Sequence, residues 1–246
     1  MKLFQYIGEY AYLMGKVFRR PENLKIYWRQ LVKEIDSLGV GSLTIVAIIS
    51  IFMGAVITIQ SAFGFDSPWI PVYAVGLATR DSIILEFSPT IISLILAGKV
   101  GSNIASELGT MRVSEQIDAL EIMGINSAGY LILPKIIAAV IMNPFLIMIS
   151  MFLGIMGGYL FGVVTGVVTA DEFIIGIQFQ FRPYNITYAL MKTVVFAFII
   201  TSVSSYHGYF TKGGALEVGV SSTKAVVYSN ILILIFNFLL TQLLLA

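Results

Sequence analysis

Charged and metal-binding residues are scarce in this chain of 246 residues. It has no cysteine and one histidine, which excludes a disulfide framework, an iron–sulfur cluster, a thiolate zinc site and a multi-histidine metal centre. Only 12% of the residues are charged, against about 25% in soluble domains, while 57% are hydrophobic. Lysine and arginine number 15 against 14 acidic residues, so no basic field attracts nucleic acid. We therefore expect an integral membrane protein with no nucleic-acid partner and no metal.

Long stretches without charge mark the expected membrane spans. Each of the longest exceeds the roughly 20 residues that cross a bilayer. These uncharged runs cover residues 37–65, 136–170 and 225–246. Two further apolar segments are each interrupted by a single charge, Glu86 in one and Lys192 in the other. We predict an all-α integral membrane protein with five transmembrane helices, near residues 41–63, 82–100, 136–164, 184–206 and 225–245.

The distribution of basic residues predicts the orientation in the membrane. An odd number of spans places the two termini on opposite sides, and lysine and arginine are enriched on the cytoplasmic side. Most of them precede the first span or fall in the second-to-third and fourth-to-fifth connections. Only Arg80, Arg182 and Lys192 lie near the other side. The N-terminus is therefore expected in the cytoplasm and the C-terminus outside it.

Residues 1–38 are expected to form an amphipathic helical segment ahead of a permease domain at 39–246. Apolar residues recur there at helical spacing instead of forming the continuous core of a secretory signal. Pro21 should end the first helix. A basic amphipathic helix of this kind can lie in the membrane interface. The alternative is that it packs on the cytosolic face of the protein itself.

The connection between the second and third spans concentrates charge. A short cytosolic helix is expected near 114–123, with Thr110 or Ser114 as its N-cap and Gly124 as its C-terminal stop. The charged residues of this connection include Glu107, Arg112, Glu115, Asp118 and Glu121. An apolar stripe that could dock into a partner consists of Val113, Ile117 and Leu120. Spacing alone leaves open whether the helix docks or is merely solvated.

The sequence lacks a motif for nucleotide hydrolysis or nucleophilic catalysis. No GxxxxGK[ST] loop occurs, and the single His207 follows Ser204-Ser205-Tyr206, where a residue at a helix end is expected. We predict a chain that is not an enzyme. If nucleotide powers it, another chain must hydrolyse that nucleotide.

The charged connection also carries a resemblance to a known family. Residues 107–124, Glu-Leu-Gly-Thr-Met-Arg-Val-Ser-Glu-Gln-Ile-Asp-Ala-Leu-Glu-Ile-Met-Gly, follow Ala97-Gly-Lys-Val-Gly-Ser102 and precede Tyr130-Leu-Ile-Leu-Pro134. Together they resemble the signature of the MlaE/YrbE permeases of MCE-type ABC lipid transporters, and the resemblance extends over essentially the whole chain. It favours a coupling helix at 114–123.

The resemblance implies a homodimeric permease in the bacterial inner membrane. Such a permease moves phospholipid between that membrane and a ring of MCE proteins in the periplasm. Cytoplasmic ATPase subunits would bind ATP and Mg, while this chain holds no cofactor, and a STAS-type accessory subunit is a further implied partner. The chain departs from the family pattern at Leu85, where an arginine is common, and at Asn237, where an acidic residue is common.

Two groups of residues are candidate sites. Glu86 and Lys192 are ionisable within spans and lie at comparable depth near the outer side, so we predict that they pair across a cavity and contribute to a polar rim near a lipid headgroup. A structural ion pair is the alternative. Phe52 and Phe63 are candidates for contact with lipid tails. The candidate ATPase-coupling residues are Glu107, Arg112, Glu115, Ile117, Asp118, Leu120 and Glu121.

Other classes of function remain open at this point. An ion-coupled secondary transporter could use Glu86 and Lys192 as a relay, although five spans do not divide into two equal repeats. A membrane scaffold without transport activity would bind partners but have no cavity. In the third span, small residues at four-residue spacing allow close helix packing, either between subunits or within one chain. These are Gly154, Gly158, Gly162 and Gly166.

Overall fold

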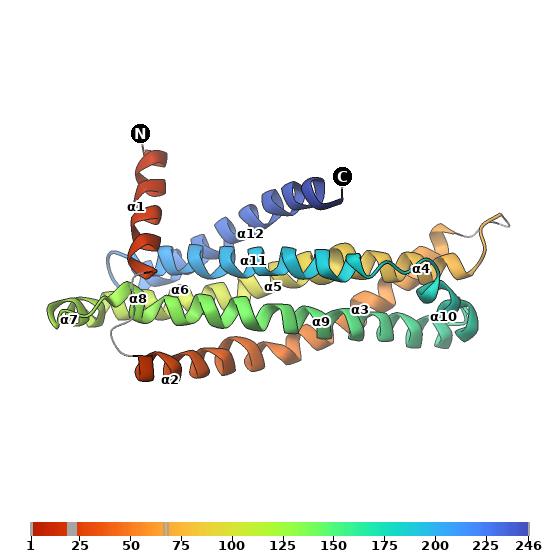
Figure 1. Cartoon of the computed structure of the whole chain (residues 1–246), viewed down its shortest axis with the longest axis horizontal. Helices are drawn as coiled ribbons and strands as arrows, with labels where there is room; N and C mark the ends of the chain where they lie inside the picture. The colour runs from red at the N-terminus through yellow and green to blue at the C-terminus, as the bar shows by residue number, and fades with distance from the viewer. Residues whose placement is uncertain (1, 19–23, 66, 68, 246) are drawn as a thin grey trace. The chain divides into compact units, whose positions relative to one another are not determined.

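The computed structural model describes residues 2–18, 24–65, 67 and 69–245 of the chain (Figure 1). Every regular element within these residues is a helix, and five helical runs are long and apolar enough to cross a membrane. They are Tyr27–Gly64, Tyr73–Val113, Ser127–Val164, Tyr184–Tyr209 and Ala215–Leu245. The prediction of an all-α protein with five candidate spans is confirmed. Pro21, expected to end the first helix, lies outside the described residues.

Several runs consist of more than one helical segment. The first contains α2 (Leu24–Glu34), the π-helical η1 (Ile35–Val40) and α3 (Gly41–Gly64). The second contains α4 (Tyr73–Ser82), the π-helical η2 (Ile83–Ile91), α5 (Ile92–Leu96), the π-helical η3 (Ala97–Gly101) and α6 (Ser102–Val113). The remaining elements are α1 (Lys2–Val17), α7 (Gln116–Ile122), α8 (Ser127–Leu131), α9 (Leu133–Val164), α10 (Ala170–Gln178), α11 (Tyr184–Tyr209) and α12 (Ala215–Leu245).

The second run remains helical through Pro89, which lies inside η2. A proline lacks the N–H group of the backbone ladder, and its ring clashes with the carbonyl four residues earlier in an α-helix. A π-helical turn bonds at a five-residue spacing and is wider, so it can accommodate that ring without ending the helix. We attribute the π-helical geometry around Glu86 to this proline.

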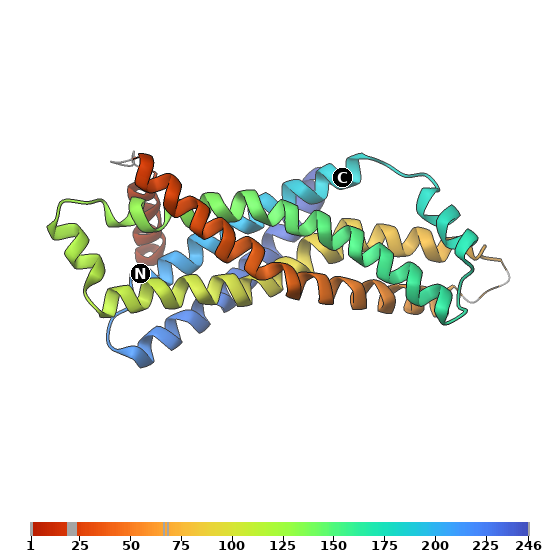
Figure 2. The ribbon, with the colours of Figure 1, turned by 90° about the horizontal axis from the view of Figure 1, so that it is seen from below.

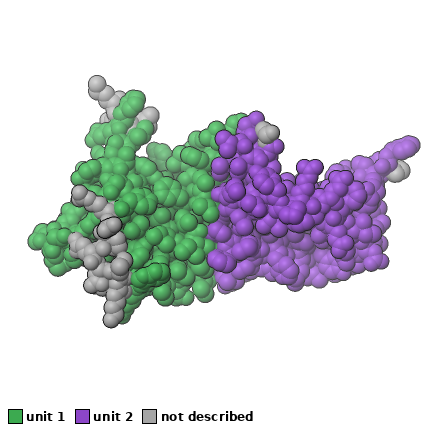
Figure 3. Space-filling view, in the orientation of Figure 1, with its two compact units in different colours: residues 1–42, 94–143, 194–239 green, residues 43–93, 144–193, 240–246 purple. Residues whose placement is uncertain are grey.

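The described chain forms two compact units, shown separately coloured in Figure 3. Unit 1 comprises residues 1–42, 94–143 and 194–239, and unit 2 comprises residues 43–93, 144–193 and 240–246. Unit 1 therefore contains the charged connection between the second and third spans. Unit 2 contains both Glu86 and Lys192.

In unit 1, α1 packs one face against the rest of the unit. Leu13, Met14 and Val17 are buried, and the Tyr10 hydroxyl donates a hydrogen bond to Oγ of Ser202 at 2.8 Å. Burial also raises the pKa of the Tyr10 phenol. Other positions of α1 expose large apolar side chains, which include Phe4, Ile7 and Tyr12.

In unit 2, glycines bring α3 and α9 into backbone contact. A Cβ atom on Gly54 would collide with the carbonyl of Gly154, and one on Gly157 would collide with Ile51 of α3. Only glycine allows two helices to approach this closely. The glycine pattern of the third span thus packs within the chain at these positions.

The short helices α4 and α10 of unit 2 lie side by side (Figure 1). Gly76 and Gly176 permit the close approach, because a side chain at either would meet the backbone of the other helix. The guanidinium group of buried Arg80 donates to the carbonyls of Ile177 and Phe179 at 2.7 and 2.8 Å and pairs with Asp81 at 2.8 Å. Arg80 therefore holds the C-terminal end of α10.

Candidate functional sites

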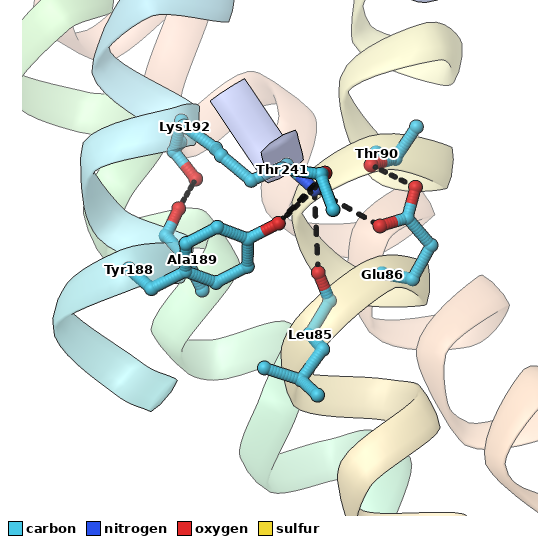
Figure 4. A network of polar contacts seen from close by, with 8 residues as sticks. Leu85, Glu86, Thr90, Tyr188, Ala189, Lys192 and Thr241 are labelled. Carbon is cyan, nitrogen blue, oxygen red and sulfur yellow. Dashed lines mark hydrogen bonds and ion pairs between the residues drawn. The ribbon is translucent and has the colours of Figure 1, made fainter. Parts of the chain in front are cut away.

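The first candidate site is an ion pair within unit 2. Nζ of Lys192 on α11 lies 2.9 Å from Oε2 of Glu86 on η2 (Figure 4). The Lys192 side chain is completely buried, whereas that of Glu86 is 44% exposed. The pairing that the sequence predicted is thus present, with the carboxylate as its accessible partner.

Further polar groups surround the buried ammonium group. It donates to the Tyr188 hydroxyl at 3.1 Å, and both Oγ1 of Thr241 and the carbonyl of Leu85 lie at 3.4 Å (Figure 4). Burial of an ammonium ion without partners is very costly, so these acceptors offset its desolvation. The other oxygen of Glu86 accepts a hydrogen bond from Thr90 at 3.1 Å.

Sequence reasoning missed three residues of this network, Thr90, Tyr188 and Thr241. Tyr188 could have been found, because it precedes Lys192 by one helical turn and shares its face of α11. Thr241 lies on another helix, and its position depends on packing. Leu85, noted as a departure from the family pattern, contributes its backbone carbonyl, which does not depend on the side chain.

The two phenylalanines predicted for lipid contact are exposed, Phe52 at 59% and Phe63 at 79%. The Phe52 ring lies 6.2 Å from that of Phe161 on α9. Among the contacts of the described residues, neither phenylalanine joins the Glu86 network. Their exposed positions on α3 suit contact with hydrocarbon but do not distinguish bound lipid from bulk membrane.

The opposite side of η2 borders a small cavity in unit 2. Its lining includes Ser50, Ser88 and Ser150 together with apolar side chains such as Phe87 and Ile91. The three hydroxyls form a chain in which Ser50 donates to Ser150 at 2.8 Å and Ser150 donates to Ser88 at 3.0 Å. η2 therefore carries the charged pair on one side and a hydroxyl chain on the other.

The second candidate site is the charged connection in unit 1, where α7 joins α6 to α8 (Figure 2). α7 covers Gln116–Ile122 and is shorter than predicted. The predicted capping by Thr110 or Ser114 is wrong: Ser114 is the C-terminal cap of α6, and its hydroxyl donates back to the Thr110 carbonyl at 2.7 Å. Glu115 then adopts a left-handed conformation with φ of 60°.

The predicted stop at Gly124 is confirmed. Gly124 has φ of +78°, and its N–H group bonds to the Glu121 carbonyl at 3.0 Å. The N–H group of Ile125 reaches the Leu120 carbonyl, also at 3.0 Å. This pair of bonds is the Schellman arrangement that glycine favours at the end of a helix.

Most charged groups of this connection have partners within the chain. Arg112 pairs with Asp118 at 2.6 Å, and Glu107 pairs with Lys135 at 2.7 Å. Glu121 accepts hydrogen bonds from Tyr209 at 2.8 Å and from Ser127 at 3.0 Å. The bond from Tyr209, more than any other contact, holds the pKa of Glu121 below its usual range.

The apolar stripe predicted for docking is partly wrong. Ile117 is completely buried within unit 1, because the helix turns this face inward, and Leu120 is half-buried. The large apolar side chains that are most exposed here lie at the C-terminal end of α7 instead: Ile122 is exposed by 87%, and Met123, which follows the helix, by 65%. Glu115 is also exposed, at the other end of the helix.

Five apolar spans with an ion pair within them and a structured charged connection define a multi-pass membrane protein. A family model described as permease MlaE matches residues 31–243, and the chain belongs to this family of ABC transporter permeases. Permease subunits of this class are typically non-catalytic.

Three relatives illustrate the range of similar proteins. A probable ABC transporter permease protein of Rickettsia bellii is 38% identical over 99% of this chain and 93% of its own length. The chloroplastic protein TRIGALACTOSYLDIACYLGLYCEROL 1 of Arabidopsis thaliana is 34% identical over 94% of this chain and 65% of its own length. The intermembrane phospholipid transport system permease protein MlaE of Haemophilus influenzae is 28% identical over 97% of this chain and 91% of its own length.

Proposed function

We propose that this chain is the membrane-spanning subunit of a phospholipid transporter in a bacterial inner membrane. Two copies would assemble with cytoplasmic ATPase subunits, a periplasmic ring of MCE proteins and a STAS-type accessory subunit. ATP and Mg would bind to the ATPase and not to this chain. Support comes from family membership and from the MlaE relative, whose name states intermembrane phospholipid transport.

The observation that carries the proposal is the asymmetric burial of the Glu86–Lys192 pair. The amine is completely buried and anchored, whereas the carboxylate is 44% exposed. An ionisable group inside a span is costly and usually functional. In this proposal the accessible edge of the pair faces the headgroup of a lipid, while the apolar side chains of α3, including Phe52 and Phe63, contact its tails.

Coupling to the ATPase would occur at α7. The exposed side chains of Ile122 and Met123 provide the apolar contact, with Glu115 at the other end. The internally paired Arg112, Asp118 and Glu121 hold the helix in place. In the orientation proposed from the basic residues, α1 lies at the cytoplasmic membrane interface, with its exposed apolar side chains toward lipid.

The test is lipid transfer by the assembled complex in proteoliposomes, with Glu86→Gln and Lys192→Met variants. Asp171→Asn is the matched control, because Asp171 is an exposed carboxylate of unit 2 outside the network. We expect both site variants to assemble but to lose most transfer, while the control transfers normally.

Two results would overturn the proposal or its site. Normal lipid transfer by both site variants would overturn the role of the pair at the lipid headgroup and reduce it to a structural contact. The second is substrate movement that depends on an ion gradient and persists without the ATPase, which would favour a secondary transporter. Mass spectrometry of the purified complex checks its subunits and its bound lipids.

A further inference from the structure

A second buried lysine, outside the Glu86 network, connects three helices of unit 1. Nζ of Lys135, at the start of α9, lies 2.7 Å from Oε1 of Glu34 on α2 and 2.7 Å from Oε2 of Glu107 on α6. Lys135 and Glu34 are buried, and the Glu107 side chain is 45% exposed. These three residues form the Lys135 cluster.

In the Lys135 cluster, the charge of each group agrees with its exposure to water. A buried carboxylate such as Glu34 requires a cation, and Lys135 supplies it. The single ammonium group cannot neutralise two carboxylates, and the excess negative charge falls on Glu107, the member that water reaches. Such an arrangement fixes the three helices to one another more firmly than an exposed ion pair, which contributes little.

The cluster also lies at one end of a π-helical segment. Glu34 immediately precedes η1 in the first span. At the other end, Nζ of Lys99 donates to the carbonyl of Gly41, the residue that follows η1. Lysines from two other spans therefore hold both ends of η1. π-helical turns are rare in proteins, and many of those that occur lie at functional sites. A π-helical segment with a lysine contact at each end therefore has a fixed geometry.

We propose that Lys135 is a positioning residue that makes α2 and α6 one rigid body. α6 ends at Val113, directly before α7, and a helix transmits displacement along its axis. The inference rests on the proposed function: when an ATPase moves α7, the Lys135 cluster passes the motion of α6 to the first span. Without the cluster, ATP hydrolysis is no longer coupled to lipid transfer, although the ATPase stays bound to the permease.

The absence of cysteine makes a direct test possible, since introduced cysteines are the only sites in this chain for spin labels, and the chain can be labelled before the complex is assembled. Lys33→Cys on α2 and Asn103→Cys on α6 are exposed positions outside the cluster. In a reconstituted complex in which only one of the two copies carries the labels, we expect one narrow distance distribution between them. It stays unchanged between the nucleotide-free state and the state trapped with a non-hydrolysable ATP analogue.

Glu107→Gln in the labelled background should broaden this distribution and lower the lipid transferred per ATP by about tenfold, within the range of known couplings between sites. Glu107 is half-exposed, so this variant should fold even if Lys135→Met does not. Lys135→Arg, made in the labelled parental background, should keep both readouts at parental values, because it keeps the charge. Glu217→Gln, which removes an exposed carboxylate of α12, is the control and should match the parent.

The inference is overturned if Glu107→Gln leaves both the distance distribution and the transfer per ATP at parental values. It is also overturned if the parental distance changes on trapping, since α2 and α6 would then move separately. A parental complex that hydrolyses ATP but transfers no lipid contradicts the proposed function instead, and the distances still decide whether the rigid body exists.

Discussion

The hydroxyl group of Tyr209 donates a hydrogen bond to Oε1 of Glu121 at 2.8 Å. Tyr209 is the last residue of α11, and Glu121 lies on α7, so the bond joins the charged connection to the end of the fourth span. Ser127 of α8 donates to the same oxygen at 3.0 Å. The position of α7 therefore depends on a carboxylate held by two hydroxyl groups.

Tyr209→Phe should loosen α7. Loss of one hydrogen bond to a charged group costs about 1.5 kcal/mol when the group is buried, and less here because Glu121 is exposed. A spin label on Gln116→Cys should become more mobile in this variant. Tyr228→Phe, at a tyrosine that stacks on His207, is the control. Equal label mobility in both variants would contradict the role of Tyr209.

The same contact should depend on pH. The hydrogen bond from Tyr209 lowers the pKa of Glu121, so the ionised form is favoured in the folded protein. The stabilisation is complete above the ordinary glutamate pKa of about 4.3 and is lost as the pH falls through the lower folded value. We expect label mobility at Gln116→Cys to rise on acidification, with a midpoint closer to the ordinary pKa in Tyr209→Phe. A midpoint that is the same in both proteins would be evidence against this assignment.

Ile122→Glu should impair binding of the ATPase. Ile122 is 87% exposed at the end of α7, and a charge placed in an apolar contact is costly. We expect the apparent affinity for the ATPase to fall by at least about tenfold, equivalent to about 1.4 kcal/mol. Leu216→Glu, at an equally exposed leucine on α12, is the control. Unchanged co-purification of the ATPase with Ile122→Glu would place the docking surface elsewhere.

Gly54→Ala should destabilise unit 2. Its new Cβ atom would collide with the Gly154 backbone, which cannot move like a flexible side chain. Overpacking costs about 1–3 kcal/mol, and the melting temperature should fall by about 5 °C. Gly64→Ala on the same helix meets no atom within 4 Å and should melt like the parent. If the two variants have the same melting temperature, the protein lacks the close contact between α3 and α9.

The spans were predictable because charge is excluded from hydrocarbon, so gaps between charges mark them directly. The Glu86–Lys192 pair was predictable for a related reason: an unpaired charge within a span is costly, so two opposite charges at similar depth are expected to pair. Lys135 was not recognised, because at the edge of an uncharged run it resembles an ordinary cytosolic charge. Its partners Glu34 and Glu107 belong to other helices, and only packing brings them together.

The errors at α7 also have local physical causes. A serine hydroxyl can cap the next helix or bond back to the preceding one, and sequence does not distinguish these choices. Ser114 bonds back to Thr110, so α7 starts later than predicted. Periodicity correctly placed Ile117 on an apolar face, but it could not say whether the chain itself or a partner covers that face.

Arg80→Gln should release the end of α10. The buried guanidinium group binds two carbonyls of Ile177 and Phe179, where the helix dipole is negative, and it also neutralises Asp81. Each lost hydrogen bond from the buried charged group costs about 1.5 kcal/mol or more, whereas water can replace part of the contact with Asp81, which is 33% exposed. We therefore expect a clear fall in melting temperature and faster proteolysis within residues 178–183. Arg182→Gln, at an exposed arginine of the same unit, should change neither property. Because the wild-type bonds lie within unit 2, the effect should appear in the isolated permease; a change seen only in the assembled complex would mean that Arg80 acts on a partner.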